Sequence, residues 1–205
     1  TGIPGDFSGR IAYIEEIGTG QEKISRLKVM DADGENAKTI TEVAGSIFSP
    51  TWSPDGNRIA YSVQRDKSYP VIYVQSVSGG GATPLTPFPG SNLSPSFSPD
   101  GSKILFSSSF EGSADIYEMS ASGGTPRRIT NWPSSEVQPN YAPDGKSFVF
   151  VSDRAGFNKP RIYRYEFGSG RTTQVSSSGY ATSPQFSSDG LQIPFLSGRS
   201  AATMN

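Results

Sequence analysis

One seven-residue motif, repeated four times, constrains the fold of this 205-residue chain more than any other feature. Each copy starts with Pro, carries an aromatic residue at its third position and ends in Asp-Gly, and the copies occupy residues 50–56, 95–101, 139–145 and 184–190. Their aspartates, Asp55, Asp100, Asp144 and Asp189, are separated by 45, 44 and 45 residues. A fixed period of this size is typical of a stacked structural repeat, so the chain is predicted to consist of similar units.

Each unit is predicted to contain four short strands. In the unit that starts at Pro95, extended pieces at 95–98, 104–106, 115–119 and 127–130 are separated by turns rich in Gly, Pro, Asp and Ser. The second piece is apolar without alternation, as expected for a strand covered on both faces. Four strands in about 45 residues are typical of a β-propeller blade, so we predict an all-β propeller. The predicted blades are 10–43, 50–87, 95–131, 139–176 and, in part, 184–205.

The first and last units are incomplete. Residues 10–13 match residues 58–61, but no copy of the motif precedes them, and the last unit ends after its second strand, near 193–196. A four-bladed ring closed by residues 184–187 would leave 193–196 as a surplus strand. We therefore expect three full and two partial blades of a larger ring, with exposed apolar faces and strand edges.

Composition excludes several classes of function. The chain has no Cys and no His, which removes disulfides, thiolate sites, a Ser-His-Asp triad and His-ligated zinc from its own residues. The net charge of −1 predicts no broad basic face for nucleic acid. No apolar run approaches the roughly 20 residues of a membrane-spanning helix, and residues 1–5 do not resemble a signal peptide.

The repeated aspartates are interpreted as turn caps rather than as metal ligands. Each occupies the same local motif, in which Asp bonds to its own backbone and Gly adopts a positive φ. The glycine run 79–81 is likewise interpreted as a turn, because it lacks the Lys-Ser/Thr pair and the helix of a phosphate-binding loop.

Variation is concentrated just before the repeated motif. The segments 46–49, 91–94, 136–138 and 181–183 differ from one another, whereas the motif that follows them is constant. In a propeller, loops at this position surround one mouth of the central channel, and function concentrates on such loops. The candidate partner-binding residues are Ser46, Phe48, Ser91, Asn92, Leu93, Ser94, Glu136, Val137, Gln138 and Thr182.

The motif Ser-Pro-Asp-Gly, followed by Ile-Ala-Tyr and then by Ile-Tyr-x-Met and a Gly-Gly turn, resembles the repeat of the TolB-type propeller family. Residues 1–13 look like the junction at which the N-terminal α/β domain of that family passes into its propeller, and residues 152–156 are similar to a hairpin of its blades. The resemblance covers essentially the whole chain. It implies a linker at 1–9 from an α/β domain that is missing here, a propeller at 10–205, and a six-bladed parent ring of about 270 residues.

The same resemblance implies a function. Members of the family are non-enzymatic, periplasmic parts of the Tol–Pal envelope system, which supports outer-membrane integrity and cell division. They bind the peptidoglycan-associated lipoprotein Pal over one mouth of the propeller, contact TolA through their N-terminal region, and admit colicin translocation segments into the channel. Relatives can also hold calcium in the channel, where carboxylate and carbonyl oxygens suit the ion, although the resemblance singles out no calcium ligands in this chain.

Two other classes of function remain open. The repeats are also similar to the gating propeller of prolyl-oligopeptidase-like serine peptidases, but that activity requires a hydrolase domain with a Gly-x-Ser-x-Gly motif and a His, and this chain has neither. A carbohydrate-binding or lyase propeller would need channel histidines or clustered acids. We therefore predict no enzymatic activity for these residues.

Overall fold

The structure is a computed structural model that describes residues 9–156, 159–177 and 179–198. Apart from a short 3-10 helix, η1 (Gly20–Glu22), every regular element in these ranges is a β-strand, which confirms the predicted all-β class. Residues 1–8 of the predicted linker and residues 199–205 of the last predicted blade lie outside the described ranges. Among the residues described, no helix has the length and apolar character that crossing a bilayer requires.

The strands form antiparallel sheets, each made of strands that follow one another in the sequence, and we call these sheets blades 1 to 5. Blade 1 contains β1 (Arg10–Ile17), β2 (Ile24–Asp31) and β3 (Lys38–Ala44). Blade 2 contains β4 (Ser46–Trp52), β5 (Arg58–Gln64), β6 (Val71–Ser76) and β7 (Thr83–Pro84). Blade 3 contains β8 (Asn92–Phe97), β9 (Lys103–Ser108), β10 (Asp115–Ser120) and β11 (Arg127–Arg128). Blade 4 contains β12 (Glu136–Tyr141), β13 (Ser147–Ser152), β14 (Arg161–Glu166) and β15 (Thr172–Gln174), and blade 5 pairs β16 (Tyr180–Thr182) with β17 (Leu196–Gly198).

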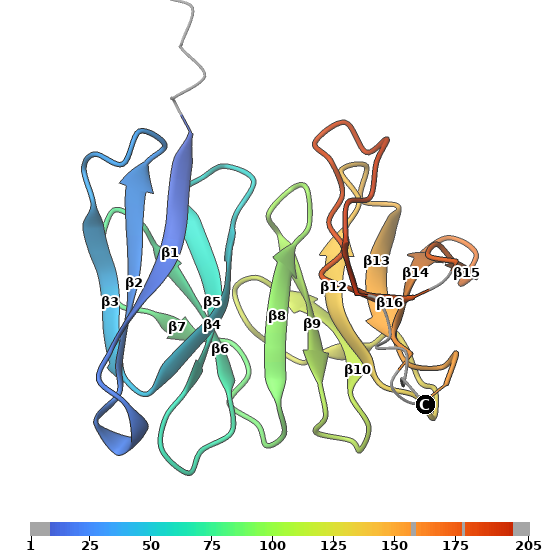
Figure 1. Cartoon of the computed structure of the whole chain (residues 1–205), viewed down its shortest axis with the longest axis horizontal. Coiled ribbons are helices and arrows are strands. Elements are labelled where there is room, and N and C mark those ends of the chain that lie inside the picture. Colours follow the sequence, from blue (N-terminus) through green and yellow to red (C-terminus); the bar gives the residue numbers. More distant parts are fainter. Residues whose placement is uncertain (1–8, 157–158, 178, 199–205) are drawn as a thin grey trace, which may run out of the picture.

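The core lies between neighbouring blades, which stand side by side (Figure 1). Leu105 and Phe106 are adjacent on β9, and both are fully buried. Phe106 packs in a cluster with Ile72 of blade 2, whereas Leu105 packs in a cluster with Phe148 of blade 4. Each central blade is therefore apolar on both faces, which explains why its second strand shows no alternation in the sequence.

The repeated Asp-Gly segments, preceded by Pro in blades 2 to 4 and by Ser188 in blade 5, form tight turns between the first and second strands of a blade. In blade 3, Asp100 accepts hydrogen bonds from the backbone N–H of Ser102 (3.0 Å) and from the hydroxyl of Ser98 (2.6 Å), and Gly101 has a φ of 69°. The carboxylates of Asp55, Asp144 and Asp189 accept the equivalent backbone bond from Asn57, Lys146 and Leu191. The interpretation of these aspartates as turn caps is confirmed.

Blades 1 and 5 differ from the blades between them. β1 takes the place that the second strand has in blades 2 to 4, and within the described residues it pairs with β2 alone. Apolar side chains are exposed at both ends of the row of blades, among them Ile11 (42%), Leu191 (83%) and Leu196 (67%). The described residues thus form an incomplete propeller, as the sequence predicted.

Candidate functional site in the channel and at its mouth

The first strands of blades 2 to 4 are bent immediately before their proline, and the chain adopts the same backbone conformation just after β16 of blade 5. In β4 the pairing with β5 shifts by one residue between Phe48 and Thr51, and β8 and β12 shift at the aligned place. The residue before the proline has a φ of 49° to 54° in every case, at Ser49, Ser94, Gln138 and Ser183. Such a backbone costs a non-glycine residue about 1–2 kcal/mol, so its recurrence in four blades, three of them with a β-bulge, shows that it belongs to the repeated blade structure.

Three residues from each of blades 2 to 5, at and just after this backbone conformation, line a cavity of about 220 Å³, which we call the channel. They are Ser49, Pro50 and Thr51, Ser94, Pro95 and Ser96, Gln138, Pro139 and Asn140, and Ser183, Pro184 and Gln185. The wall is joined by side chains that bond to the next strand. The Ser96 hydroxyl accepts from the Tyr141 N–H (3.1 Å), and Gln138 Oε1 accepts from the Ser183 N–H (2.9 Å). Because the lining carries no charge, it suits hydrogen bonding to an extended peptide better than proton transfer.

The channel wall does not fit a calcium ion well. Calcium sites in proteins use carboxylates together with carbonyl and water oxygens. The residues that line the channel offer hydroxyl, amide and carbonyl oxygens but no carboxylate. Among the described residues, no group of three or more His, Cys, Asp and Glu side chains is placed to hold a metal ion.

A larger cavity of about 790 Å³, the mouth cavity, opens where the bent strands begin. Phe48 of β4 and Leu93 of β8 supply apolar wall, and Tyr69 and Pro70 of the β5–β6 hairpin face the same space. Tyr69 is 60% exposed, and among the described residues that line this cavity Lys67 is the one charged residue. The mouth therefore combines an apolar patch, a single positive charge and an entrance to the polar channel.

The structure brings together five of the ten predicted contact residues. Phe48, Ser91, Leu93, Ser94 and Gln138 all line the mouth cavity. Ser46 lines an adjoining cavity of about 360 Å³, Val137 packs half-buried against the core of blade 4, and Thr182 is half-buried on β16. For these eight residues, contact with a partner stays a prediction.

The predicted segments are mostly not loops, because most of their residues lie in the first halves of β4, β8 and β12 or in β16. Their pairing with the second strands turns the residue three positions before each proline into the interior of the blade. Asn92 and Glu136 occupy this position and are completely buried. The Asn92 amide donates to the carbonyls of Pro70 and Gly90 (both 3.0 Å). The Asn92 side chain thus joins blade 3 to blade 2, whereas the Glu136 side chain bonds to Ser152 within blade 4, so we remove both from the set of contact residues.

Glu136 belongs to a buried network beside the mouth. Its Oε1 accepts hydrogen bonds from Ser134 (2.5 Å) and Ser152 (2.8 Å), and Arg154 lies 3.5 Å away. Burial, with a smaller contribution from the Asp115 carboxyl, raises the pKa of Glu136 to about 7. Glu136 therefore supports the structure and does not act as a catalytic acid, because its side chain has no exposed surface through which a substrate could reach it.

Nothing in the repeat singles out the hairpin 65–70, although Lys67, Tyr69 and Pro70 line the mouth cavity. The hairpins at the same place in blades 3 and 4 have unrelated sequences, so alignment of the units does not select it. Its one signal is Tyr69, an aromatic residue in an otherwise polar turn.

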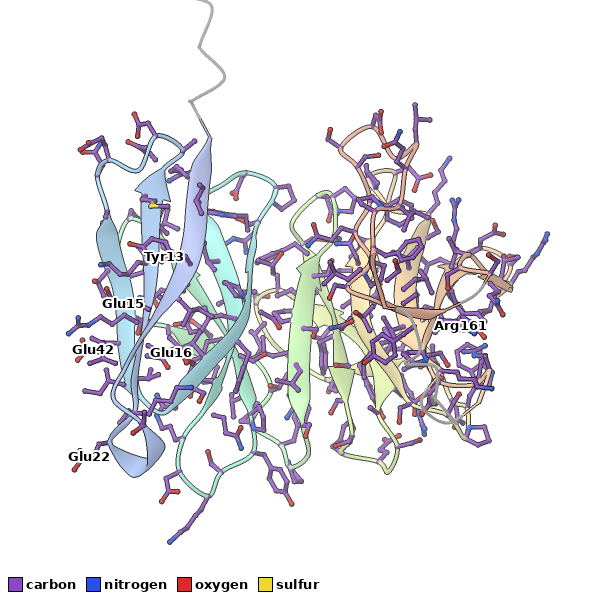
Figure 2. The ribbon with its side chains drawn as sticks, viewed as in Figure 1. Tyr13, Glu15, Glu16, Glu22, Glu42 and Arg161 are labelled. Carbon is purple, nitrogen blue, oxygen red and sulfur yellow. The ribbon has the colours of Figure 1, made fainter. Side chains whose placement is uncertain are left out.

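The acidic side chains of blade 1 do not form a site. Figure 2 shows Glu15, Glu16 and Glu42 on this blade. Glu15 and Glu42 pair with Arg26, and Glu16 pairs with Lys23. These side chains are between 25% and 49% exposed, so each pair is worth about 0–1 kcal/mol and no ligand is needed to explain it.

Comparison with known proteins agrees with this architecture. A family model described as the TolB beta propeller domain matches residues 1–204. The Tol-Pal system protein TolB of Nitrosomonas europaea is 46% identical over 78 residues, which are 38% of this chain and 17% of that protein. The crystal structure of TolB from Acinetobacter baumannii is similar over 98% of this chain, with a TM-score of 0.84 and 41% identity.

This chain covers only 50% of the solved Acinetobacter baumannii protein. A structure of prolyl endopeptidases is also similar over 92% of the chain, with a TM-score of 0.64. At 14% identity that likeness shows the shared propeller fold alone.

Proposed function

Because the chain belongs to the TolB β-propeller family, we propose that it acts as a protein-binding scaffold of the Tol-Pal system and not as an enzyme. In this proposal it works in the periplasm, binds the peptidoglycan-associated lipoprotein Pal over the mouth cavity, and so supports outer-membrane integrity and cell division. TolA contacts the region that precedes the propeller in the family, and colicin translocation segments enter the same channel. The Tol-Pal names of the relatives support this assignment.

The mouth cavity is the observation that carries the proposal. Its volume of about 790 Å³ and its mixture of Phe48, Leu93 and Tyr69 with polar groups are typical of a recognition site. Tyr69 offers a large apolar ring at low cost in conformational entropy, which is a property of interface residues. A protein loop that fills this cavity would place its backbone at the entrance of the polar channel.

The absence of catalytic groups supports the non-enzymatic part of the proposal. The chain contains no His and no Cys, and the described residues that line the channel include no Asp, Glu or Lys. General acid–base and nucleophilic catalysis both need a titratable or activated side chain close to the substrate. The described wall supplies only hydroxyl and amide groups.

Truncation of the apolar wall tests the proposal. We expect Phe48→Ala, Leu93→Ala and Tyr69→Ala each to weaken binding of purified Pal by about 5- to 30-fold, the usual loss at an anchoring side chain. Affinity would be measured by isothermal titration calorimetry on the protein that carries this chain. Thr125→Ala is the matched control, because Thr125 is exposed in the turn between β10 and β11, away from the mouth.

Unchanged affinity in all three variants would contradict the proposed site. A melting temperature equal to that of the parent protein excludes unfolding as the cause of any loss. Phe48 and Tyr69 are partly exposed, so their truncation is expected to leave the fold intact.

A further inference from the structure

Neighbouring blades are fastened by an arginine at two successive interfaces. Arg10 of blade 1 lies over the Trp52 ring of blade 2 (4.8 Å) and donates to the Gly56 carbonyl. Arg58 of blade 2 lies over the Phe97 ring of blade 3 (5.3 Å) and donates to the Gly101 carbonyl (2.9 Å). Ring and glycine belong to the repeated motif, so each blade presents a ready-made guanidinium site to the blade before it.

The third interface has the site but not the arginine. Lys103 occupies the position of Arg58, and its Nζ turns toward Glu118 (3.3 Å) instead of the Tyr141 ring. A methyl group added to Gly101 would meet the Arg58 guanidinium at 3.1 Å, whereas one added to Gly145 would meet only carbons of Pro99, at 3.6 Å or more. Among the described residues, no hydrogen bond reaches the Gly145 carbonyl.

A cavity of about 410 Å³ lies at this third interface, where an arginine at position 103 would otherwise extend toward Tyr141 and Gly145. We call this cavity the slot. Its lining includes Lys103, Glu118 and Arg127 from blade 3 and Tyr141, Asp144 and Gly145 from blade 4. The Glu118 side chain is 9% exposed and accepts from Arg127 (2.9 Å) and from the Tyr141 hydroxyl (2.7 Å).

The charge of the slot favours a cation. Asp100, Glu118 and Asp144 outnumber the two cations in the lining, Lys103 and Arg127. Hydrogen bonds from Ser98 and Ser102 lower the pKa of Asp100 to about 2, so this carboxylate is ionised at neutral pH.

We propose that the slot between blades 3 and 4 binds an arginine side chain of a partner protein, which completes there the contact that Arg10 and Arg58 make at the first two interfaces. A guanidinium is planar and can stack on Tyr141 while it donates to the Gly145 carbonyl, whereas an ammonium is a compact charge that does only one of these. The slot lies beyond the end of β8, and the mouth cavity lies at its beginning, so this site is separate from the one proposed for Pal.

The probe for the test is N-acetyl-arginine amide, titrated into the isotope-labelled protein and followed by NMR. We expect saturable shifts of the Gly145 and Lys146 amides, and we expect N-acetyl-lysine amide to bind at least about fivefold more weakly than the arginine probe. K103R is expected to abolish these shifts, because the new arginine fills the slot from within the chain as Arg58 does one blade earlier.

R58K provides the reciprocal test. It should open an equivalent slot and create arginine-dependent shifts at Gly101, and this result does not depend on how well K103R folds. The proposal is overturned if the arginine probe leaves Gly145 unmoved, if it binds K103R as well as the parent, or if the lysine probe binds equally well. None of these results depends on Pal, so failure here and failure at the mouth are distinguishable.

Discussion

The buried position three residues before each proline shows how one place in a repeat can change its chemistry without changing its packing. The residue at this position lies opposite a residue of the second strand, and the pairs are Ile47–Val63, Asn92–Ser108 and Glu136–Ser152. The first pair is apolar, and the other two are joined by hydrogen bonds of 2.7 and 2.8 Å. Each of these two polar side chains thus has at least one hydrogen-bonding partner, which lowers the cost of burying it, although Oε2 of Glu136 has none among the described residues.

Glu136 makes stability depend on pH. Its pKa is raised in the folded protein, so the folded state holds a proton that the unfolded chain has already released between about pH 4.5 and 7. The contribution of Glu136 to the free energy of unfolding is therefore fully present below about pH 4.5, and it is lost as the pH rises through 7. We expect Glu136→Gln, which mimics the protonated acid, to gain on the order of 1–3 kcal/mol over the parent at pH 8 and little at pH 4.5.

Urea unfolding at several pH values measures this difference. Glu111→Gln is the control, because Glu111 is a carboxylate whose side chain is 46% exposed. A gain that is equal at pH 4.5 and pH 8 would show that titration of Glu136 is not the cause.

Single residues were the hardest level to predict from the sequence. Asn92 and Glu136 are polar and lie in variable segments, which favours a role at the surface. The aligned positions hold Ile47 and Ala181, and that apolar column was the available sign of an inward-facing site. The bulge concealed it, because one extra residue breaks the alternation by which a strand is recognised.

At the scale of whole strands, the arginine contacts explain why neighbouring blades hold a fixed relation. Each joins the start of a second strand to the motif of the next blade through both a ring and a carbonyl. In the contact of blade 4 with blade 5, Arg164 of β14 reaches the Phe186 ring (5.9 Å) from a different strand. The aromatic residue of the motif is therefore a receptor for a cation as well as a packing residue.

Removal of one such contact should measurably loosen the stack. We expect Arg58→Ala to lower the free energy of unfolding by about 1–3 kcal/mol, through the lost cation–π contact and the lost charged hydrogen bond to Gly101. Arg171→Ala removes an exposed charge from the turn before β15 and should change stability by less than about 0.5 kcal/mol. Equal effects of the two substitutions in chemical denaturation would argue against the contact.

The strands themselves follow well from the sequence. Apolar runs bounded by Pro-Asp-Gly and Gly-rich turns predict β5, β9 and β13 and their partners. The positive φ at Ser49 and its equivalents could not be predicted, because serine or glutamine before proline normally favours extended backbone. The blade imposes that conformation because the residues after the proline resume pairing with the second strand in a register shifted by one residue.

At the scale of the molecule, protection of the backbone should fall from the centre of the row of blades toward its ends. β9 and β13 are buried along almost their whole length, whereas β1 pairs on one side in the described residues and β17 is exposed. We expect amide hydrogen exchange of β9 and β13 to be slower than that of β1 and β17 by at least about 100-fold. Uniform protection would contradict this gradient and would indicate that the end blades are covered in solution.

The 45-residue period was sufficient to predict the overall architecture. It fixes the size of the blade, and the apolar second strands require that blades cover one another. The positions of the mouth cavity and of the slot were not predictable, since both arise where side chains from two or more units meet. The slot in particular depends on Lys103 replacing an arginine, a change that appears conservative in the sequence.

The bonds that join neighbouring blades also bear on how the chain reaches its native state. They link residues 43, 45 and 46 positions apart, as in Arg58–Gly101, Ser96–Tyr141 and Asn140–Phe186. In the described residues each sheet consists of strands that follow one another in the sequence and are joined by still shorter loops. Contact order therefore stays low for a β protein. Nucleation can then occur at any blade and spread to either side, as in other linear arrays. A growing chain would add each blade to a finished one as soon as about 45 more residues had emerged.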